Sequence, residues 1–124
     1  MNTLIAIFVG GGMGSLARFG IGKWMTGIVP ASFPYGTLAA NILSSLLLGL
    51  FLGFSIGKPE NENQLRFLVA VGFCGGFSTF STFSAETLEL IRNGMFFYAG
   101  INVIGNLILC MLMIVSGIWI SKNF

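Results

Sequence analysis

Four long stretches of the chain carry almost no charge, and each is long enough to cross a lipid bilayer as a helix. About 20 helical residues span the hydrocarbon core of a membrane, because each residue adds about 1.5 Å of rise. Within residues 3–22, 35–57, 67–85 and 93–121, Arg18 is the single charge. The sequence therefore predicts an all-α integral membrane protein, a single domain over residues 1–124 with spans near residues 3–22, 35–57, 67–90 and 95–121.

The composition excludes several classes of protein. Only 8% of the residues are charged, whereas a soluble domain carries about a quarter. With no His, no Asp and four Glu, the chain has almost nothing from which to build a catalytic triad, a His metal site or a proton relay. Cys74 and Cys110 lie in apolar runs, where free thiols usually pack as small hydrophobes. The net charge of +2 is too small and scattered to indicate a nucleic-acid partner, and we expect no enzyme.

The cations give little information about orientation. Four spans place both chain ends on one side, and the side richer in Lys and Arg normally faces the cytoplasm. The cations divide three to two, or three to three when Arg18 near the edge of its span is counted. The side with the chain ends would hold Lys58, Arg66 and Lys122, and the other side Lys23 and Arg92. Both orientations are therefore open to the chain.

Small residues recur four positions apart in the first two spans. Such spacing lets membrane helices approach closely, either inside one chain or between two copies. Four helices alone leave little room for a polar route, and this favours an oligomer. The residues are Gly10 and Gly14, Ala40 and Ser44, and Gly49, Gly53 and Gly57.

Polar groups within the spans are concentrated in the third, where Gly75 and Gly76 precede hydroxyls at positions 78, 79, 81 and 82. Gly costs about 1 kcal/mol in a helix relative to Ala, and hydroxyls compete for backbone partners. A broken helix at membrane depth is tolerated only where protein or a polar cavity satisfies the freed backbone groups. We predict a break between Gly75 and Ser78 as a candidate site; the alternative is a glycine kink that serves only packing.

Four phenylalanines accompany this cluster. Phe73, Phe77, Phe80 and Phe83 follow spacings of four, three and three, which predicts one stripe along a helix. Such a stripe usually faces lipid or a neighbouring helix, but here it is interleaved with hydroxyls. Because aromatic ring edges are electropositive, the same stretch can also face an anion.

Other donors lie in the remaining spans. Asn41, in the middle of the second, must either join helices or line a polar path. Asn102, Asn106 and Cys110 share one face of the fourth, with the same two alternatives. Arg18 either extends to the nearer interface or raises the anion concentration at a pore mouth. No carboxylate lies in the middle of a span, so a small anion suits these groups better than a cation.

Three segments resemble the Fluc (CrcB) family of fluoride channels. Residues 72–84, GFCGGFSTFSTFS, closely resemble its third-span signature. Residues 11–18, GGMGSLAR, resemble its first-span motif, and residues 36–41, GTLAAN, its second-span asparagine motif. The resemblance implies an antiparallel, dual-topology homodimer in the bacterial inner membrane. It also implies two pores that export fluoride passively, with a structural sodium ion between the subunits.

The resemblance also assigns roles to residues. Pore aromatics would be Phe80 and Phe83, and Asn41 would be a pore-lining donor. The polar pore region would comprise Ser81, Thr82 and Ser84, and the sodium would be held by the main-chain carbonyls of Gly75 and Ser78. The fourth span departs from the family, because Cys110 and Ile114 occupy places where some members carry hydroxyls. The polar track there, near Asn106, is left open.

Two other classes of protein share this size and number of spans. A small dual-topology antiporter needs a membrane-embedded Glu that exchanges protons and substrate, and the first span contains no acid. A non-transporting assembly subunit would use its glycine faces only to bind other membrane proteins.

Overall fold

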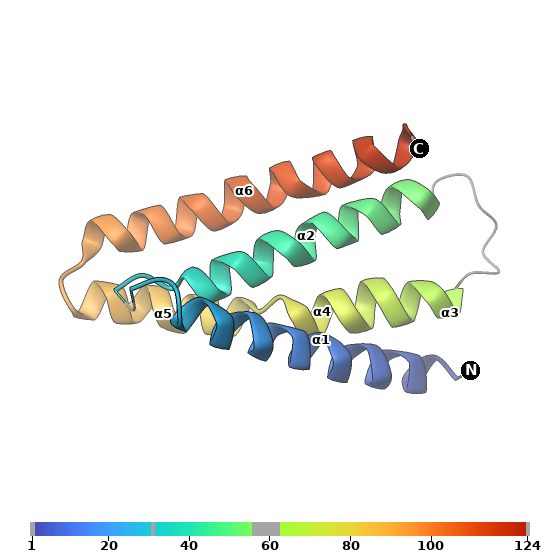
Figure 1. Ribbon diagram of the computed structural model, residues 1–124, viewed down its shortest axis with the longest axis horizontal. Helices are drawn as coiled ribbons and strands as arrows, with labels where there is room; N and C mark the ends of the chain where they lie inside the picture. The colour runs from blue at the N-terminus through green and yellow to red at the C-terminus, as the bar shows by residue number, and fades with distance from the viewer. Residues whose placement is uncertain (1, 31, 56–62, 124) are drawn as a thin grey trace.

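The computed structural model describes residues 2–30, 32–55 and 63–123, and these residues form an all-helical bundle. Four helical segments are long and apolar enough to cross a membrane, which confirms the prediction of a multi-pass membrane protein. In Figure 1 the segments run side by side, and the two ends of the chain lie at the same end of the molecule. The elements are α1 (Thr3–Thr26), α2 (Tyr35–Ser55), α3 (Asn63–Arg66), the π-helix η2 (Phe67–Cys74), α4 (Gly75–Phe77), α5 (Phe80–Arg92) and α6 (Phe96–Lys122).

The helix ends follow from local sequence. Asn2 caps α1 through its side-chain oxygen, which accepts a hydrogen bond from the Leu4 N–H at 3.0 Å. At the other end α1 continues past the expected limit at Gly22, because the cation of Lys23 in the last turn is favourable at a helix C-terminus. Gly94 has a φ of 76°, which a residue with a side chain rarely adopts, and it allows the turn from α5 into α6. Residues 56–62, which include the end of the expected second span and most of the 58–64 loop, lie outside the described residues.

The bundle consists of two closely packed helix pairs, α2 against α6 and α1 against η2 and α4. A Cβ added at Gly14 would overlap the backbone of Phe73, and one added at Gly117 would lie 2.6 Å from the Leu46 carbonyl oxygen. Backbones approach this closely only where side chains are absent.

The spaced small residues of the first two spans therefore pack within one chain. Every one of them that is described is buried, and the glycines among them contact the backbone or side chains of another helix. Gly57 lies outside the described residues. These faces thus follow the first of the two alternatives, close packing inside one chain.

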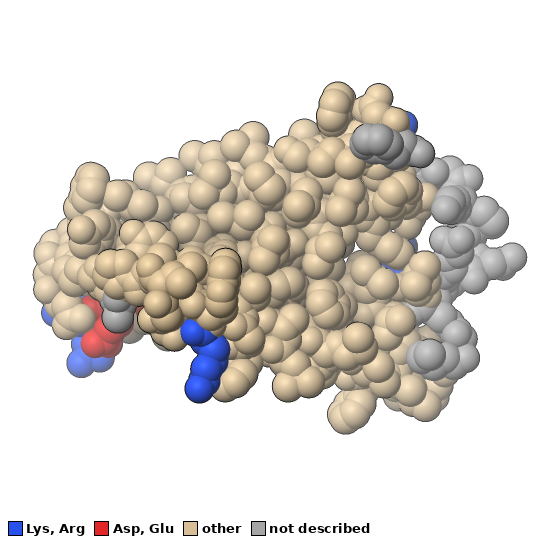
Figure 2. Space-filling model, in the orientation of Figure 1, with Lys and Arg blue, Asp and Glu red and all other residues tan. Residues whose placement is uncertain are grey.

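The outer surface is apolar. Large side chains such as Phe8, 82% exposed, and Phe97, 77% exposed, point away from the bundle, whereas most buried side chains are small. On the face shown in Figure 2 uncharged residues cover the broad middle, and the charged side chains lie toward the two ends. This distribution suits a protein surrounded by hydrocarbon with its ends in water.

Candidate functional site

The third span contains two residues in extended conformation. Ser78 has φ −86° and ψ 155°, and Thr79 has φ −148° and ψ 125°, so α4 ends at Phe77 and α5 begins at Phe80. Gly75 has the helical angles φ −64° and ψ −38°. The extended residues therefore lie at the end of the predicted interval and one residue beyond it, rather than at the glycines.

Side chains from elsewhere take the backbone amides that would continue the helix. The Thr79 N–H, which a continuous helix would give to the Gly75 carbonyl, donates to Asn41 Oδ1 at 3.2 Å. The Thr82 N–H, the helical partner of the Ser78 carbonyl, donates to Thr79 Oγ1 at 3.3 Å. The carbonyl oxygens of Gly75 and Ser78 thus lose, to side chains, the donors that a continuous helix would give them.

A groove of about 450 Å³ lies beside these extended residues, between α2, α5 and α6. It brings together the expected pore residues Asn41, Phe80 and Phe83, and it also includes Ser78, which was expected at the sodium site. It also includes the three fourth-span positions that the sequence left open. Its lining mixes polar and apolar residues and, among the described residues, contains no acidic or basic side chain. In full, the lining residues are Asn41, Ser45, Ser78, Thr79, Phe80, Phe83, Val103, Asn106, Leu107, Cys110, Met111 and Ile114.

Three of the expected pore residues, Ser81, Thr82 and Ser84, lie outside this groove. Ser81 and Ser84 are exposed on the first turns of α5, and neither lines the cavity. Thr82 is half-buried, and its hydroxyl accepts a hydrogen bond from Thr79 Oγ1 at 3.3 Å. In the single chain, therefore, none of these three hydroxyl residues lines the groove.

The phenylalanines form two pairs rather than one stripe. Phe73 and Phe77 meet edge to face with their ring centroids 5.5 Å apart, and Phe77 is buried. Phe80 and Phe83 are 5.6 Å apart and tilted by 51°, and Phe80 is 79% exposed. The extended residues rotate the second pair relative to the first, so only Phe80 and Phe83 reach the groove.

Hydrogen-bonded amides connect the groove to the interior. Asn41 Nδ2 donates to Asn106 Oδ1 at 2.9 Å, and Asn106 Nδ2 donates to Asn102 Oδ1 at 2.9 Å. Asn102 Nδ2 in turn donates to Thr87 Oγ1 at 2.8 Å. The four-residue spacing of Asn102 and Asn106 was a usable signal in the sequence, but nothing there indicated Thr87 as their partner.

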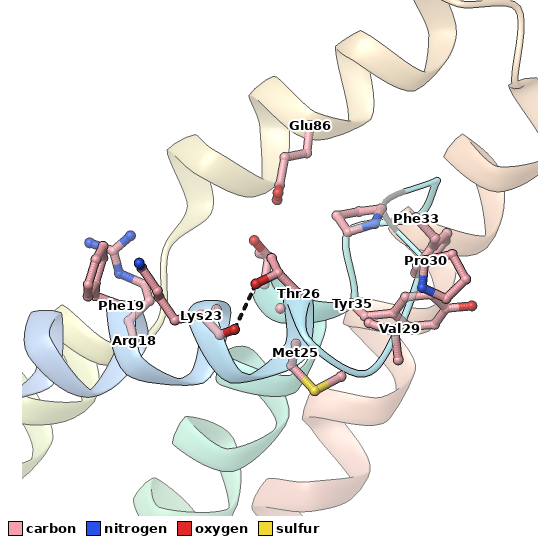
Figure 3. Close-up of a pocket in the computed structure, with 14 residues that line it drawn as sticks. Arg18, Phe19, Lys23, Met25, Thr26, Val29, Pro30, Phe33, Tyr35 and Glu86 are labelled. Atoms are coloured by element: carbon pink, nitrogen blue, oxygen red, sulfur yellow. Dashed lines mark hydrogen bonds between the residues drawn. The ribbon is translucent and has the colours of Figure 1, made fainter.

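Arg18 lies at a different cavity, of about 540 Å³, near one end of the bundle. Its Nε donates to the Gly76 carbonyl at 3.3 Å, so this side chain is tied to the third span and does more than extend toward the interface. Lys23 and Glu86 line the same cavity, and Glu86 Oε1 is buried with no hydrogen-bond partner in the described part of the chain. Figure 3 shows Glu86 pointing from α5 toward α1, with Arg18 and Lys23 off to one side.

The described residues contain no group of three His, Cys, Asp or Glu side chains that could hold a metal ion.

Comparison with known proteins identifies the family. A sequence model described as "CrcB-like protein, Camphor Resistance (CrcB)" matches residues 5–118. A protein of Geobacter metallireducens named fluoride-specific ion channel FluC is 37% identical over 123 residues, 99% of each chain. A protein of the same name from Geotalea daltonii is 40% identical over 118 residues, which cover 95% of each chain. Another, from Pyrococcus abyssi, is 36% identical over 125 residues, which cover 99% of this chain and 98% of the relative. The chain therefore belongs to the CrcB-like family, as its resemblance in the first three spans indicated.

Proposed function

We propose that the protein is a fluoride-selective ion channel, not an enzyme, that lets fluoride leave the bacterial cytoplasm passively across the inner membrane. The observation that carries this proposal is the groove, which combines the Asn41 amide with the rings of Phe80 and Phe83 and has no acidic or basic lining residue. The names of the relatives, each a fluoride-specific ion channel, support it.

The groove suits a small anion for electrostatic reasons. Fluoride holds its hydration shell tightly, so a selective path must replace the lost water with donors at close range. Asn41 offers an amide nitrogen, and Phe80 and Phe83 offer electropositive ring edges. Ser81, Thr82 and Ser84 lie outside the groove of the single chain, and in the proposed dimer they would add hydroxyl donors along the path. A cation path would need carboxylates or aligned carbonyls in this groove instead.

The working unit in this proposal is an antiparallel homodimer, with both orientations present in one membrane. Phe80 is largely exposed in the single chain, and the groove that it lines contains polar groups at membrane depth. Polar groups at that depth need protein or water around them rather than lipid. A second copy crossing the third span would cover the groove and supply the missing wall.

A structural sodium ion fits the interruption in the third span. The carbonyls of Gly75 and Ser78 lose their helical donors, and two such oxygens from each chain would make a cage of four. A hard monovalent cation can be held by main-chain oxygens without a charged ligand. Its role would be to fix the two interrupted helices against each other, and it would not travel with fluoride.

Arg18 has a supporting role in the proposal. Together with Lys23 it places two cations at the 540 Å³ cavity, against one carboxylate, that of Glu86. Net positive potential at the mouth of a path raises the local concentration of anions. Arg18 would thus attract fluoride from water without entering the groove.

Efflux from liposomes that contain the purified protein tests the function. Fluoride should leave passively and chloride should be retained. Equal fluoride and chloride fluxes would contradict selectivity. A strict requirement for a proton gradient would favour the antiporter, and the absence of any anion flux would favour a non-transporting assembly subunit.

A further inference from the structure

The amides beside the groove form one continuous hydrogen-bonded relay across three helices. It starts at the Thr79 N–H, which donates to Asn41 on α2, and passes through Asn106 and Asn102 on α6. It then reaches Thr87 on α5, whose hydroxyl donates to the Phe83 carbonyl at 2.8 Å. The relay therefore begins and ends on main-chain atoms at the start of α5.

The two ends fix the direction of every bond between them. A backbone N–H can only donate and a backbone carbonyl can only accept. Asn41 must therefore turn its oxygen toward Thr79 and its nitrogen toward Asn106, and each later amide must follow the same order. Reversing any one amide would bring two donors or two acceptors together, at a site where Asn102 is only 1% exposed.

The direction of the relay has a consequence for the groove. An amide nitrogen carries two hydrogens, and Asn41 gives one of them to Asn106 within the described residues. The second remains available to an occupant of the groove that Asn41 lines. If the amide were reversed, Asn41 would present its oxygen, an acceptor, on the side where its nitrogen now lies.

We propose that Asn102 and Thr87 are positioning residues for anion selectivity: through Asn106 they hold the Asn41 amide with its nitrogen available to the groove. Neither of them lines the groove, so each acts only through the relay. This inference rests on the proposed fluoride channel. It adds that residues away from the path decide which atom of Asn41 an anion meets.

Replacing Thr87 tests the proposal without touching the groove. Thr87→Val keeps the shape of the side chain but removes the acceptor for Asn102 Nδ2, whereas Thr87→Ser keeps the hydroxyl. We expect the ratio of fluoride to chloride efflux to fall at least about fivefold in Thr87→Val and to be unchanged in Thr87→Ser. A change of about fivefold corresponds to the net free energy of about one hydrogen bond. Thr87→Ala is made alongside, so that the result does not depend on one variant folding.

A matched control comes from Ser121, which is buried on α6. Its hydroxyl donates to the Ile118 carbonyl at 2.9 Å, as the Thr87 hydroxyl does to that of Phe83, but it takes no part in the relay. Ser121→Ala should leave the anion ratio unchanged. A general loss of folded protein lowers both fluxes together, so the ratio measured in one set of liposomes reports selectivity alone.

The outcomes separate this inference from the function on which it rests. A selective unmodified channel with an unchanged ratio in both Thr87→Val and Thr87→Ala would overturn the relay and leave the channel proposal standing. An equal fall in Ser121→Ala would also overturn it. An unmodified chain that passes chloride as well as fluoride would overturn the channel proposal itself.

Discussion

Substitutions at the adjacent glycines Gly75 and Gly76 should separate the stability of one chain from the assembly of two. A Cβ added at Gly75 meets nothing within 4 Å, whereas one added at Gly76 overlaps the backbone of Gly11. Replacing Gly by Ala inside a helix gains about 1 kcal/mol. Forcing a methyl into a filled contact costs about 1 to 3 kcal/mol. In the single chain, Gly75→Ala should therefore be neutral or stabilising, and Gly76→Ala should destabilise by up to about 2 kcal/mol.

The proposed dimer reverses this order for a bulky side chain at Gly75. There the Gly75 carbonyl would face the other copy, and the branched side chain of Gly75→Val would crowd that contact. We expect a helical monomer whose dimer dissociation constant rises at least about tenfold, equivalent to about 1.4 kcal/mol. Fluoride efflux should be lost with the dimer.

The assay combines three measurements on each variant. Circular dichroism during denaturation reports the fold of the chain, cross-linking over a range of protein-to-lipid ratios reports the dimer, and liposome efflux reports transport. A Gly75→Val protein that is dimeric and passes fluoride normally would refute the crossing of the third spans. A Gly76→Ala protein more stable than the unmodified chain would refute the close packing of α1 against α4.

Three further predictions address the rest of the site. Replacing Phe80 or Phe83 by Ile keeps most of the apolar volume and removes the ring edge, so we expect a folded protein with fluoride flux reduced at least about tenfold. Normal fluoride flux in both variants would show that the rings serve only packing. Arg18→Gln should lower the fluoride flux about twofold to fivefold at low ionic strength and much less at high salt, because salt screens the attraction between the Arg18 charge and fluoride. A loss of flux that does not depend on salt would show that the hydrogen bond to the Gly76 carbonyl matters and the charge does not. Two or three Lys added to residues 58–64 should bias insertion toward one orientation and reduce fluoride transport, and co-expression with a variant biased toward the opposite orientation should restore transport. Cysteine accessibility measures the orientation, and full transport by a chain that inserts in only one orientation would refute dual topology.

The spans, and the shared face of Phe80 and Phe83, could be predicted from the sequence because they depend on local properties. Length and apolar composition determine a membrane helix, and the spacing of Phe80 and Phe83 keeps them on one face of a short helix. The groove indeed includes both rings and Asn41.

The position of the extended residues could not be read from local propensity. Glycine weakens a helix, but Gly75 itself has helical backbone angles. The helix is interrupted where Asn41, 38 residues earlier in the chain, accepts the Thr79 N–H. Thr87 was missed for the same reason, since its link to Asn102 exists only once α5 and α6 have packed. Such contacts depend on tertiary structure, which a single sequence does not display.

The interruption at Ser78 and Thr79 also divides one helix dipole into two. An unbroken third span would carry its partial charges, about half an elementary charge each, only at its two ends. Ending α4 at Phe77 and starting α5 at Phe80 adds a negative pole and a positive pole near the middle of the span. The positive pole adjoins the groove, because Phe80 lines it. Both poles belong to the main chain and hold no titratable proton, so their signs stay the same from acidic to alkaline solution.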